Sequence, residues 1–301
     1  MPSLTAPVAV VDCGTNSIRL LVKTGSVILE RRMETTRLGR DIDRTGHLDP
    51  DGVTATLEVL AEYRGLIEAH GARAVRAVAT QAVREATDGD AFVDAATEVM
   101  GEPLEVLSGH DEARLAYAGA TSELDPDFGP FLLLDIGGGS TELATADAAM
   151  SIPVGSVRMS EQQLRSDPPA PEELSNAIAL VDAYLDDVVR EMPVVAEART
   201  MVGTGGTITT VAAVEIGLPR YDRDLIHQFV LTKEAAEDVY RTLATERLVD
   251  RVHNPGLPRE RADIIVGGCC VLVAVMRRLD FKACIVSETD ILDGIAAELM
   301  G

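Results

Sequence analysis

The chain has 301 residues, with 46% hydrophobic and 25% charged side chains, which is the composition of an ordinary water-soluble globular protein. Its formal net charge of −22 argues against nucleic acid and membrane surfaces as partners, because both are bound through a basic face. No apolar run is long enough to span a bilayer, and the four cysteines show no CxxC spacing. We therefore expect a reduced protein of the cytoplasm, with two domains at this chain length.

In the first half of the chain, the pattern predicts a sheet whose first strands pair antiparallel. An apolar run at residues 8–11 indicates a buried strand, and two further strands follow it after short turns. Asp49-Pro50 then begins a helix whose apolar side chains recur at helical spacing. The remaining predicted elements are strands at 18–22, 26–33, 75–78 and 103–107, with helices beginning near residues 79, 90 and 108.

A turn-rich stretch at residues 125–130 marks the boundary between the two predicted domains. The second half restarts with an apolar strand at residues 131–134, and the apolar segment 258–278 predicts a mostly buried helix. The other predicted elements are strands at 143–145, 150–153, 201–202 and 284–286, with helices at 171–190, after 203–207 and at 290–300.

One short phrase occurs twice in the chain, and it is the strongest indication of function. Residues 10–20 and 133–143 each continue a buried-type apolar run, and Asp, Gly, Ser and Leu coincide at matching positions. A strand that ends in aspartate and breaks into a turn of small residues places backbone N–H groups beside a carboxylate. Such a turn can bind phosphate while the carboxylate holds Mg²⁺ or water. Two copies therefore predict a duplicated phosphate-binding fold with one site between its halves.

Three turns of small residues are candidate phosphate-binding sites. Glycine lets phosphate oxygens approach the backbone at residues 137–140 and 203–207, and Thr15, Asn16 and Ser17 supply side-chain donors in the first half. Taken singly, each turn could be only structural, but three that follow strands in a duplicated chain favour a function. Neither GxGxxG nor GxxxxGKS/T occurs, so the sequence supports neither a Rossmann dinucleotide site nor a P-loop.

The chain resembles the exopolyphosphatase/guanosine pentaphosphatase (Ppx/GppA) family, within the superfamily of actin, sugar kinases and Hsp70. ATQAVRE and SGHDEARLAY separate this family from the kinases and chaperones, so the resemblance is specific. The matching phrases occur in family order and cover almost the whole chain: VVDCGTNSIRLLV (10–22), VRAVATQAVREATD (75–88), EVLSGHDEARLAYAGA (105–120), LLLDIGGGSTEL (132–143), VGTGGTITTVAA (202–213) and ERADIIVGG (260–268).

The resemblance implies an α/β fold of two actin-like domains, residues 1–124 and 125–286, with the active-site cleft between them. A C-terminal helix at about 287–301 would pack back on the first domain. The implied reaction is hydrolysis of the terminal phosphoanhydride of inorganic polyphosphate, which releases orthophosphate and uses Mg²⁺, with Mn²⁺ as the alternative metal. A homodimer is also expected from the resemblance.

The resemblance further assigns roles to single residues. Glu112 matches the general base for the attacking water, Glu142 a carboxylate that helps to hold metal or water, and Asp135 a further carboxylate on the metal side. Asp12 is a third candidate metal ligand. The groups expected to bind phosphate, from the three turns and the resemblance together, are Thr15, Asn16, Ser17, Arg19, Arg84, Gly137, Gly138, Gly139, Ser140, Thr141, Gly205, Gly206 and Thr207.

Considered without the family, some of these residues keep a second interpretation. Glu112 could be a solvated acid in the first turn of a helix, where the helix dipole favours negative charge. Arg84 could pair with Glu85 or Glu112 instead of phosphate. Arg114 is expected in a surface or structural ion pair.

Two departures from the family bear on the substrate. The chain stops without the helical C-terminal domain of long family members, and Leu292 stands where the family tail often has arginine. Both favour short to medium polyphosphate chains. The alternatives are hydrolysis of guanosine pentaphosphate (pppGpp), for which no nucleoside pocket is recognisable, an actin-like ATPase or kinase, and a non-catalytic sensor of polyphosphate or of pppGpp and ppGpp.

Overall fold

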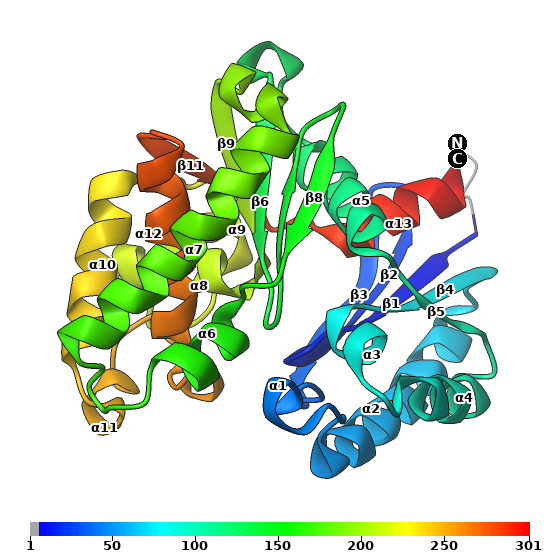
Figure 1. The fold of residues 1–301 in the computed structure, drawn as a ribbon. Coiled ribbons are helices and arrows are strands. Elements are labelled where there is room, and N and C mark those ends of the chain that lie inside the picture. Colours follow the sequence, from blue (N-terminus) through cyan, green and yellow to red (C-terminus); the bar gives the residue numbers. More distant parts are fainter. Residues whose placement is uncertain (1–5) are drawn as a thin grey trace. The chain divides into compact units, whose positions relative to one another are not determined.

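The structure is a computed structural model, and it describes residues 6–301. The chain divides into two compact units (Figure 1). Unit 1 takes the described residues up to Gly119 together with Ile291–Gly301, and unit 2 is Ala120–Asp290. Within the described part of the chain, no helix is long and apolar enough to cross a membrane.

Unit 1 is built on a five-stranded sheet in the order β3-β2-β1-β4-β5. The central strand β1 is buried along its whole length, as its unbroken apolar run predicts. β1, β4 and β5 are parallel, so the chain leaves all three at the same edge of the sheet. The strands are β1 (Val8–Cys13), β2 (Ser17–Thr24), β3 (Val27–Thr35), β4 (Ala74–Ala79) and β5 (Leu104–Val106).

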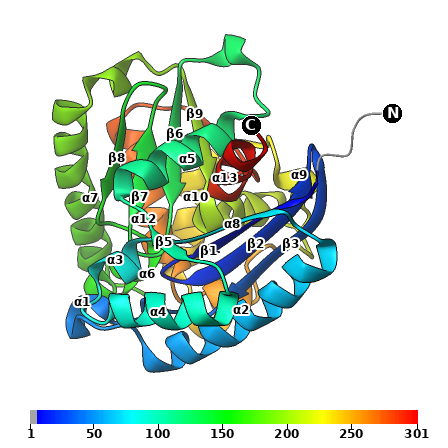
Figure 2. The ribbon, with the colours of Figure 1, turned by 90° about the vertical axis from the view of Figure 1, so that its right-hand side faces the viewer.

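Helices pack on this sheet and on one another within unit 1. The side chain of Asp49 caps the longest of them, α2, by accepting a hydrogen bond of 2.9 Å from the Gly52 N–H. α2 and α4 lie side by side in Figure 2, and α13 packs on β1 and β2. The helices are α1 (Ile42–Thr45), α2 (Pro50–His70), α3 (Gln81–Glu85), α4 (Gly89–Met100), α5 (Gly109–Thr121) and α13 (Ile291–Met300).

Two features fix α13 in unit 1. A Cβ on Gly294 would collide with the backbone carbonyl oxygen of Leu115, so the close crossing of α13 and α5 needs glycine. Asp293 binds Arg31 at 3.0 Å and Lys23 at 3.5 Å. Its neighbour Leu292, at the position of the family arginine, is only 1% exposed and belongs to the core.

Unit 2 contains a six-stranded sheet in the order β10-β11-β9-β6-β7-β8. Its strands are β6 (Phe131–Ile136), β7 (Thr141–Ala144), β8 (Ala149–Ile152), β9 (Thr200–Thr204), β10 (Val230–Thr232) and β11 (Ala283–Val286). Its helices are α6 (Ser156–Gln163), α7 (Pro171–Glu191), α8 (Gly205–Ile216), α9 (Arg223–Ile226), α10 (Lys233–Thr245), α11 (Leu248–Arg251) and α12 (Ile265–Arg278), with short 3₁₀ turns at Pro126–Phe128, Pro193–Glu197 and Arg259–Arg261.

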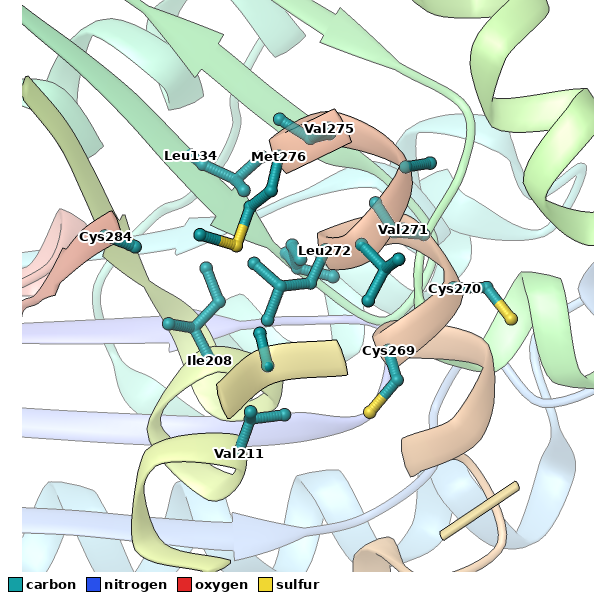
Figure 3. Packing of buried hydrophobic residues seen from close by; sticks show 14 of the residues in the cluster. Leu134, Ile208, Val211, Cys269, Cys270, Val271, Leu272, Val275, Met276 and Cys284 are labelled. Carbon is teal, nitrogen blue, oxygen red and sulfur yellow. The ribbon is translucent and has the colours of Figure 1, made fainter. Parts of the chain in front are cut away.

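The core of unit 2 is organised around α12. Every residue from 265 to 276 is buried, because α6, α7, α8 and α10 all pack against this helix. Figure 3 shows Leu272 and Met276 of α12 in one cluster with Ile208 of α8 and Leu134 of β6. This burial in the core of unit 2 explains the long apolar run in the sequence.

The predicted elements are largely confirmed, with one shifted boundary and several elements that the pattern missed. The buried helix begins at Ile265 rather than 258, because residues 259–261 form a separate 3₁₀ turn. The pattern also missed β10, α6, α9, α10 and α11 in unit 2 and α1 in unit 1. β10 has only three residues, which is too short for an alternation of burial to be recognised.

Candidate active site

The two copies of the repeated phrase fold into the same strand–turn–strand unit. The Gly14 N–H donates a hydrogen bond of 3.0 Å to the Ser17 carbonyl, and the Gly137 N–H donates one of 3.0 Å to the Ser140 carbonyl. The first turn joins β1 to β2 and the second joins β6 to β7. The sequence repeat is therefore a structural repeat.

In the first copy, the aspartate faces an arginine. Asp12 and Arg19 are partners across the β1–β2 ladder, and Arg19 donates from Nε at 2.9 Å and from Nη2 at 2.5 Å to Oδ2 of Asp12. The Asp12 side chain is 1% exposed and that of Arg19 is 23% exposed. Asp12 thus has a positive partner within its own hairpin, and it orients the guanidinium.

In the second copy, the aspartate faces another carboxylate. Asp135 and Glu142 are partners across the β6–β7 ladder, and both are buried. Oε1 of Glu142 accepts hydrogen bonds from Ser140 Oγ at 2.7 Å and from Ser151 Oγ at 2.8 Å. Ser151, which lies opposite Glu142 on β8, was not singled out in the sequence. These two hydroxyls hold the carboxylate in one orientation.

The glycine turn after β6 is fixed by the beginning of α6. The N–H groups of Ser156 and Val157 donate to the carbonyls of Gly137 at 2.9 Å and Gly138 at 2.8 Å. A Cβ on Gly155 would lie 2.5 Å from the Gly138 oxygen, so glycine is required there. Because its carbonyls are engaged inside the protein, the turn can offer amide N–H groups to a phosphate.

The residues that flank this turn are engaged internally. The Ser140 hydroxyl donates to Glu142, as described above. Thr141 is fully buried, and its hydroxyl donates to the Val154 carbonyl at 2.5 Å. Thr141 thus has a structural hydrogen bond in place of the phosphate contact that we expected from the sequence.

The third turn brings the beginning of α8 against Asp135. Gly205 has a φ of +84°, and a Cβ there would overlap Oδ1 of Asp135. A Cβ on Gly206 would overlap the guanidinium of Arg261, a buried residue of the 259–261 turn. Arg261 lies inside a matching family phrase, but nothing in its local pattern distinguished it. Thr207 is buried and packs against Gly268 of α12.

In unit 1, Glu112 and Arg84 lie together at the carboxyl edge of the sheet. Nη1 of Arg84 donates to the Leu107 carbonyl at 2.6 Å and lies 3.5 Å from Oε2 of Glu112. Glu112 is in the first turn of α5, and its N–H donates to the Ser108 carbonyl at 2.9 Å. Glu112 is thus one of the two ion-pair partners that the sequence offered for Arg84 as the alternative to phosphate.

The structure also shows the partners of two other polar residues of unit 1, Arg114 and Asn16. Arg114 forms an exposed ion pair with Glu298 at 3.0 Å, as expected from the sequence. Asn16 is buried, and its carbonyl accepts hydrogen bonds from the N–H groups of Thr36 at 3.1 Å and Arg37 at 2.9 Å. The backbone of the first turn is therefore held from outside the repeat.

Each unit gathers its own part of the predicted residues. In unit 1 these lie in β1, β2 and the turn between them and after β4 and β5. In unit 2 they lie in β6, β7 and the turn between them and at the beginning of α8, after β9. The unit 1 set is Asp12, Thr15, Asn16, Ser17, Arg19, Arg84 and Glu112. The unit 2 set is Asp135, Gly137, Gly138, Gly139, Ser140, Thr141, Glu142, Gly205, Gly206 and Thr207.

Comparison with known proteins identifies the family. A model of the Ppx/GppA phosphatase family matches residues 21–301. The chain is 37% identical to Exopolyphosphatase 2 of Mycobacterium tuberculosis H37Rv, over 98% of each chain. It is similar to the crystal structure of an exopolyphosphatase-like protein, with a TM-score of 0.93, 33% identity and 98% of each chain covered.

A second solved structure, the PPX-GPPA enzyme of Aquifex aeolicus, is 30% identical, with a TM-score of 0.81 and coverage of 97% of this chain and 99% of that one. These likenesses confirm the predicted α/β fold. The chain belongs to the Ppx/GppA phosphatase family.

Proposed function

We propose that this protein is an exopolyphosphatase that hydrolyses the terminal phosphoanhydride bond of inorganic polyphosphate and releases orthophosphate. The observation that carries the proposal is the facing pair of carboxylates, Asp135 and Glu142, beside a turn of glycine N–H groups. Phosphoryl transfer needs positioning and charge neutralisation more than covalent chemistry. The relative in Mycobacterium tuberculosis that is named Exopolyphosphatase 2 supports the same substrate class.

We propose Mg²⁺ as the cofactor, with Mn²⁺ as the alternative, held by Asp135 and Glu142. The donor set fits, because Mg²⁺ favours one or two protein carboxylates and completes its shell with water and substrate phosphate oxygens. Residues 6–301 contain no group of three or more His, Cys, Asp or Glu side chains that could hold a metal, so the two carboxylates would be its protein ligands. When bound, the metal would neutralise charge on the phosphate oxygens.

Asp12 is less suited to this metal than the two carboxylates of unit 2. Its Oδ2 already accepts two hydrogen bonds from Arg19. A cation at Asp12 would have to compete with this partly buried guanidinium contact. We therefore assign Asp12 to the orientation of Arg19, and Arg19 to phosphate binding.

We propose Glu112 as the general base. The water oxygen attacks the terminal phosphorus, the bridging P–O bond breaks, and one proton of the water passes to Glu112. The shortened polyphosphate leaves as the anion. Arg84 would orient Glu112 and, because the guanidinium has further N–H donors, bind a phosphate oxygen as well.

The remaining phosphate contacts would come from N–H groups and arginine. The N–H groups of Gly138 and Gly139 and the beginning of α8 suit an anion, since helix amino termini favour negative charge. Arg261 adds a buried cation beside Gly206. Such local positive groups are needed because the chain as a whole has a net charge of −22.

We also propose that the protein works in the cytoplasm as a homodimer. All four cysteines are free and buried, and burial raises the pKa of the Cys270 and Cys284 thiols to about 12. Such thiols stay protonated and unreactive, which suits a reducing compartment. Light scattering on a sizing column tests the dimer, and a monomeric mass at micromolar concentration would contradict it.

The proposed activity is tested by phosphate release from length-defined polyphosphates and from guanosine pentaphosphate, measured side by side with and without Mg²⁺. We expect release from polyphosphate that depends on Mg²⁺. Release of phosphate from guanosine pentaphosphate but not from polyphosphate would show that the nucleotide is the substrate. No release from any of them would remove the hydrolase assignment.

A further inference from the structure

Two buried side-chain amides in unit 1 contain hydrogen-bonding atoms that no group of residues 6–301 satisfies. Gln81, the first residue of α3, is 2% exposed, and both its Nε2 and its Oε1 lack a partner. Asn16 is 7% exposed, and its Nδ2 lacks a partner. Native proteins satisfy nearly all buried polar groups, because an unsatisfied one costs free energy. This pair therefore indicates that something outside the chain binds there.

The topology brings these amides to the same edge of the sheet. Asn16 follows β1 and Gln81 follows β4, and the Thr80 N–H donates to the Cys13 carbonyl at 3.2 Å between the two strand ends. On the other side, the Leu107 N–H donates to the Ala79 carbonyl at 3.0 Å, where β5 leads into α5 and Glu112. Gln81 thus follows the middle of three parallel strands, at the edge where α/β sheets bind ligands.

The backbone around both amides is closely packed. A Cβ on Gly39 would lie 2.6 Å from Cγ2 of Thr15 and 2.8 Å from Cβ of Ala82, the neighbours of Asn16 and Gln81. The Gly39 N–H also donates to the Thr15 carbonyl at 2.8 Å. These contacts restrict movement of the backbone that carries both amides.

We propose that Gln81 binds the reacting end of the substrate. Its Nε2 donates to an oxygen of the terminal phosphate, and its Oε1 accepts a hydrogen from the attacking water. Nδ2 of Asn16 donates to the same phosphate. An amide suits this position because the phosphate oxygens only accept hydrogen bonds, whereas the water must also donate one. Gln81 takes no proton, because the proton of the water passes to Glu112.

This inference rests on the proposed function and adds to it a residue that orients the water. Glutamine performs this task in other phosphoryl-transfer enzymes, where it positions the attacking water without acting as a base. Arg84 lies one helical turn further along α3 and contacts Glu112. The short helix α3 would therefore carry both Gln81, which orients the water, and Arg84, which contacts the general base.

The test uses Gln81→Met, which keeps the length of the side chain and removes both polar atoms. We expect kcat to fall on the order of 10- to 100-fold, as for a lost transition-state contact, while the melting temperature stays equal or rises. Affinity for inorganic phosphate, measured by calorimetry with Mg²⁺, should also fall. Gln162→Met, at an exposed glutamine of α6, is the matched control and should change none of these values.

The outcomes separate a ligand from a structural water. If Gln81 binds only a structural water, Gln81→Met should lower the melting temperature, with phosphate affinity unchanged. That result, or kcat and phosphate affinity both within about twofold of the wild type, would overturn the inference.

Two further results keep the test decisive. If Gln81→Met does not fold, Gln81→Glu decides the matter, because it keeps the shape but places a negative charge against the phosphate, and unchanged phosphate affinity would contradict us. If the wild type does not hydrolyse polyphosphate, the proposed function fails, and the calorimetry alone supports or overturns the amide site.

Discussion

Arg19 lies directly opposite Asp12 on the neighbouring strand and donates two hydrogen bonds to one oxygen of its carboxylate. The corresponding position in the second copy of the hairpin is Glu142, opposite Asp135. The two copies therefore share a backbone but differ in charge: one pairs an acid with a base, and the other pairs two acids. We infer that the duplicated hairpins have separate tasks, phosphate binding in unit 1 and metal binding in unit 2.

This difference predicts an unequal response to the loss of each carboxylate. Asp135→Asn and Glu142→Gln should each raise the half-saturating Mg²⁺ concentration by about tenfold or more, because each removes an anionic ligand. Asp12→Asn should leave the half-saturating Mg²⁺ concentration within about twofold, because we assign Asp12 to the orientation of Arg19 and not to the metal. The measurement is a Mg²⁺ titration of the initial rate for all three variants.

An equal rise in the half-saturating Mg²⁺ concentration of all three variants would indicate that Asp12 is also a metal ligand. An unchanged half-saturating Mg²⁺ concentration in both Asp135→Asn and Glu142→Gln would contradict metal binding in unit 2. Expression and melting temperature serve as controls, since Asp12→Asn weakens a partly buried ion pair and lowers stability by a mechanism unrelated to metal.

Ser151 should influence the metal through Glu142. Ser151→Ala removes one of two hydroxyl donors from Oε1 of Glu142, and the carboxylate becomes less well oriented. A hydrogen bond to a charged group contributes about 1.5–3 kcal/mol, but Ser140 remains, so we expect a rise of about 3- to 10-fold in half-saturating Mg²⁺. Ser151→Thr keeps a hydroxyl and should therefore raise the half-saturating Mg²⁺ concentration less than Ser151→Ala does. If Ser151→Ala lowers kcat with no change in Mg²⁺ dependence, Ser151 acts on something other than Glu142.

The hairpins could be predicted from the sequence because their determinants are local. A buried run, an aspartate and a turn of small residues lie within a few positions of one another, and the turn sets the register that places residue 19 opposite residue 12. Gln81 could not be predicted in this way. Its burial depends on tertiary packing, and the next residue, Ala82, packs against Gly39, which is distant in the sequence. Arg261 is similar, because its contact with Gly206 joins two segments that tertiary packing alone brings together.

Glu112→Gln should keep the fold and most substrate affinity while lowering turnover by a factor on the order of 10² to 10⁴, since the amide cannot accept the proton of the water. The side chain keeps its size, so the contact with Arg84 is weakened rather than removed. Glu58→Gln, at an exposed glutamate of α2, is the matched control. Turnover near that of the wild type in Glu112→Gln would exclude Glu112 as the base.

Substrate length should affect the rate through the charge of the whole protein. A long polyanion must leave the active site and meet the surface of a chain with net charge −22. Each phosphate beyond the site then adds little attraction and some repulsion, which salt screens over a Debye length of roughly 10 Å at 0.1 M. We expect kcat/KM to rise over the first few phosphates and then to level off or fall for chains of hundreds, with a smaller fall at higher ionic strength. Efficiency that grows steadily with length would instead indicate a basic groove for the polymer, and would overturn the preference for short chains while leaving the hydrolase assignment intact.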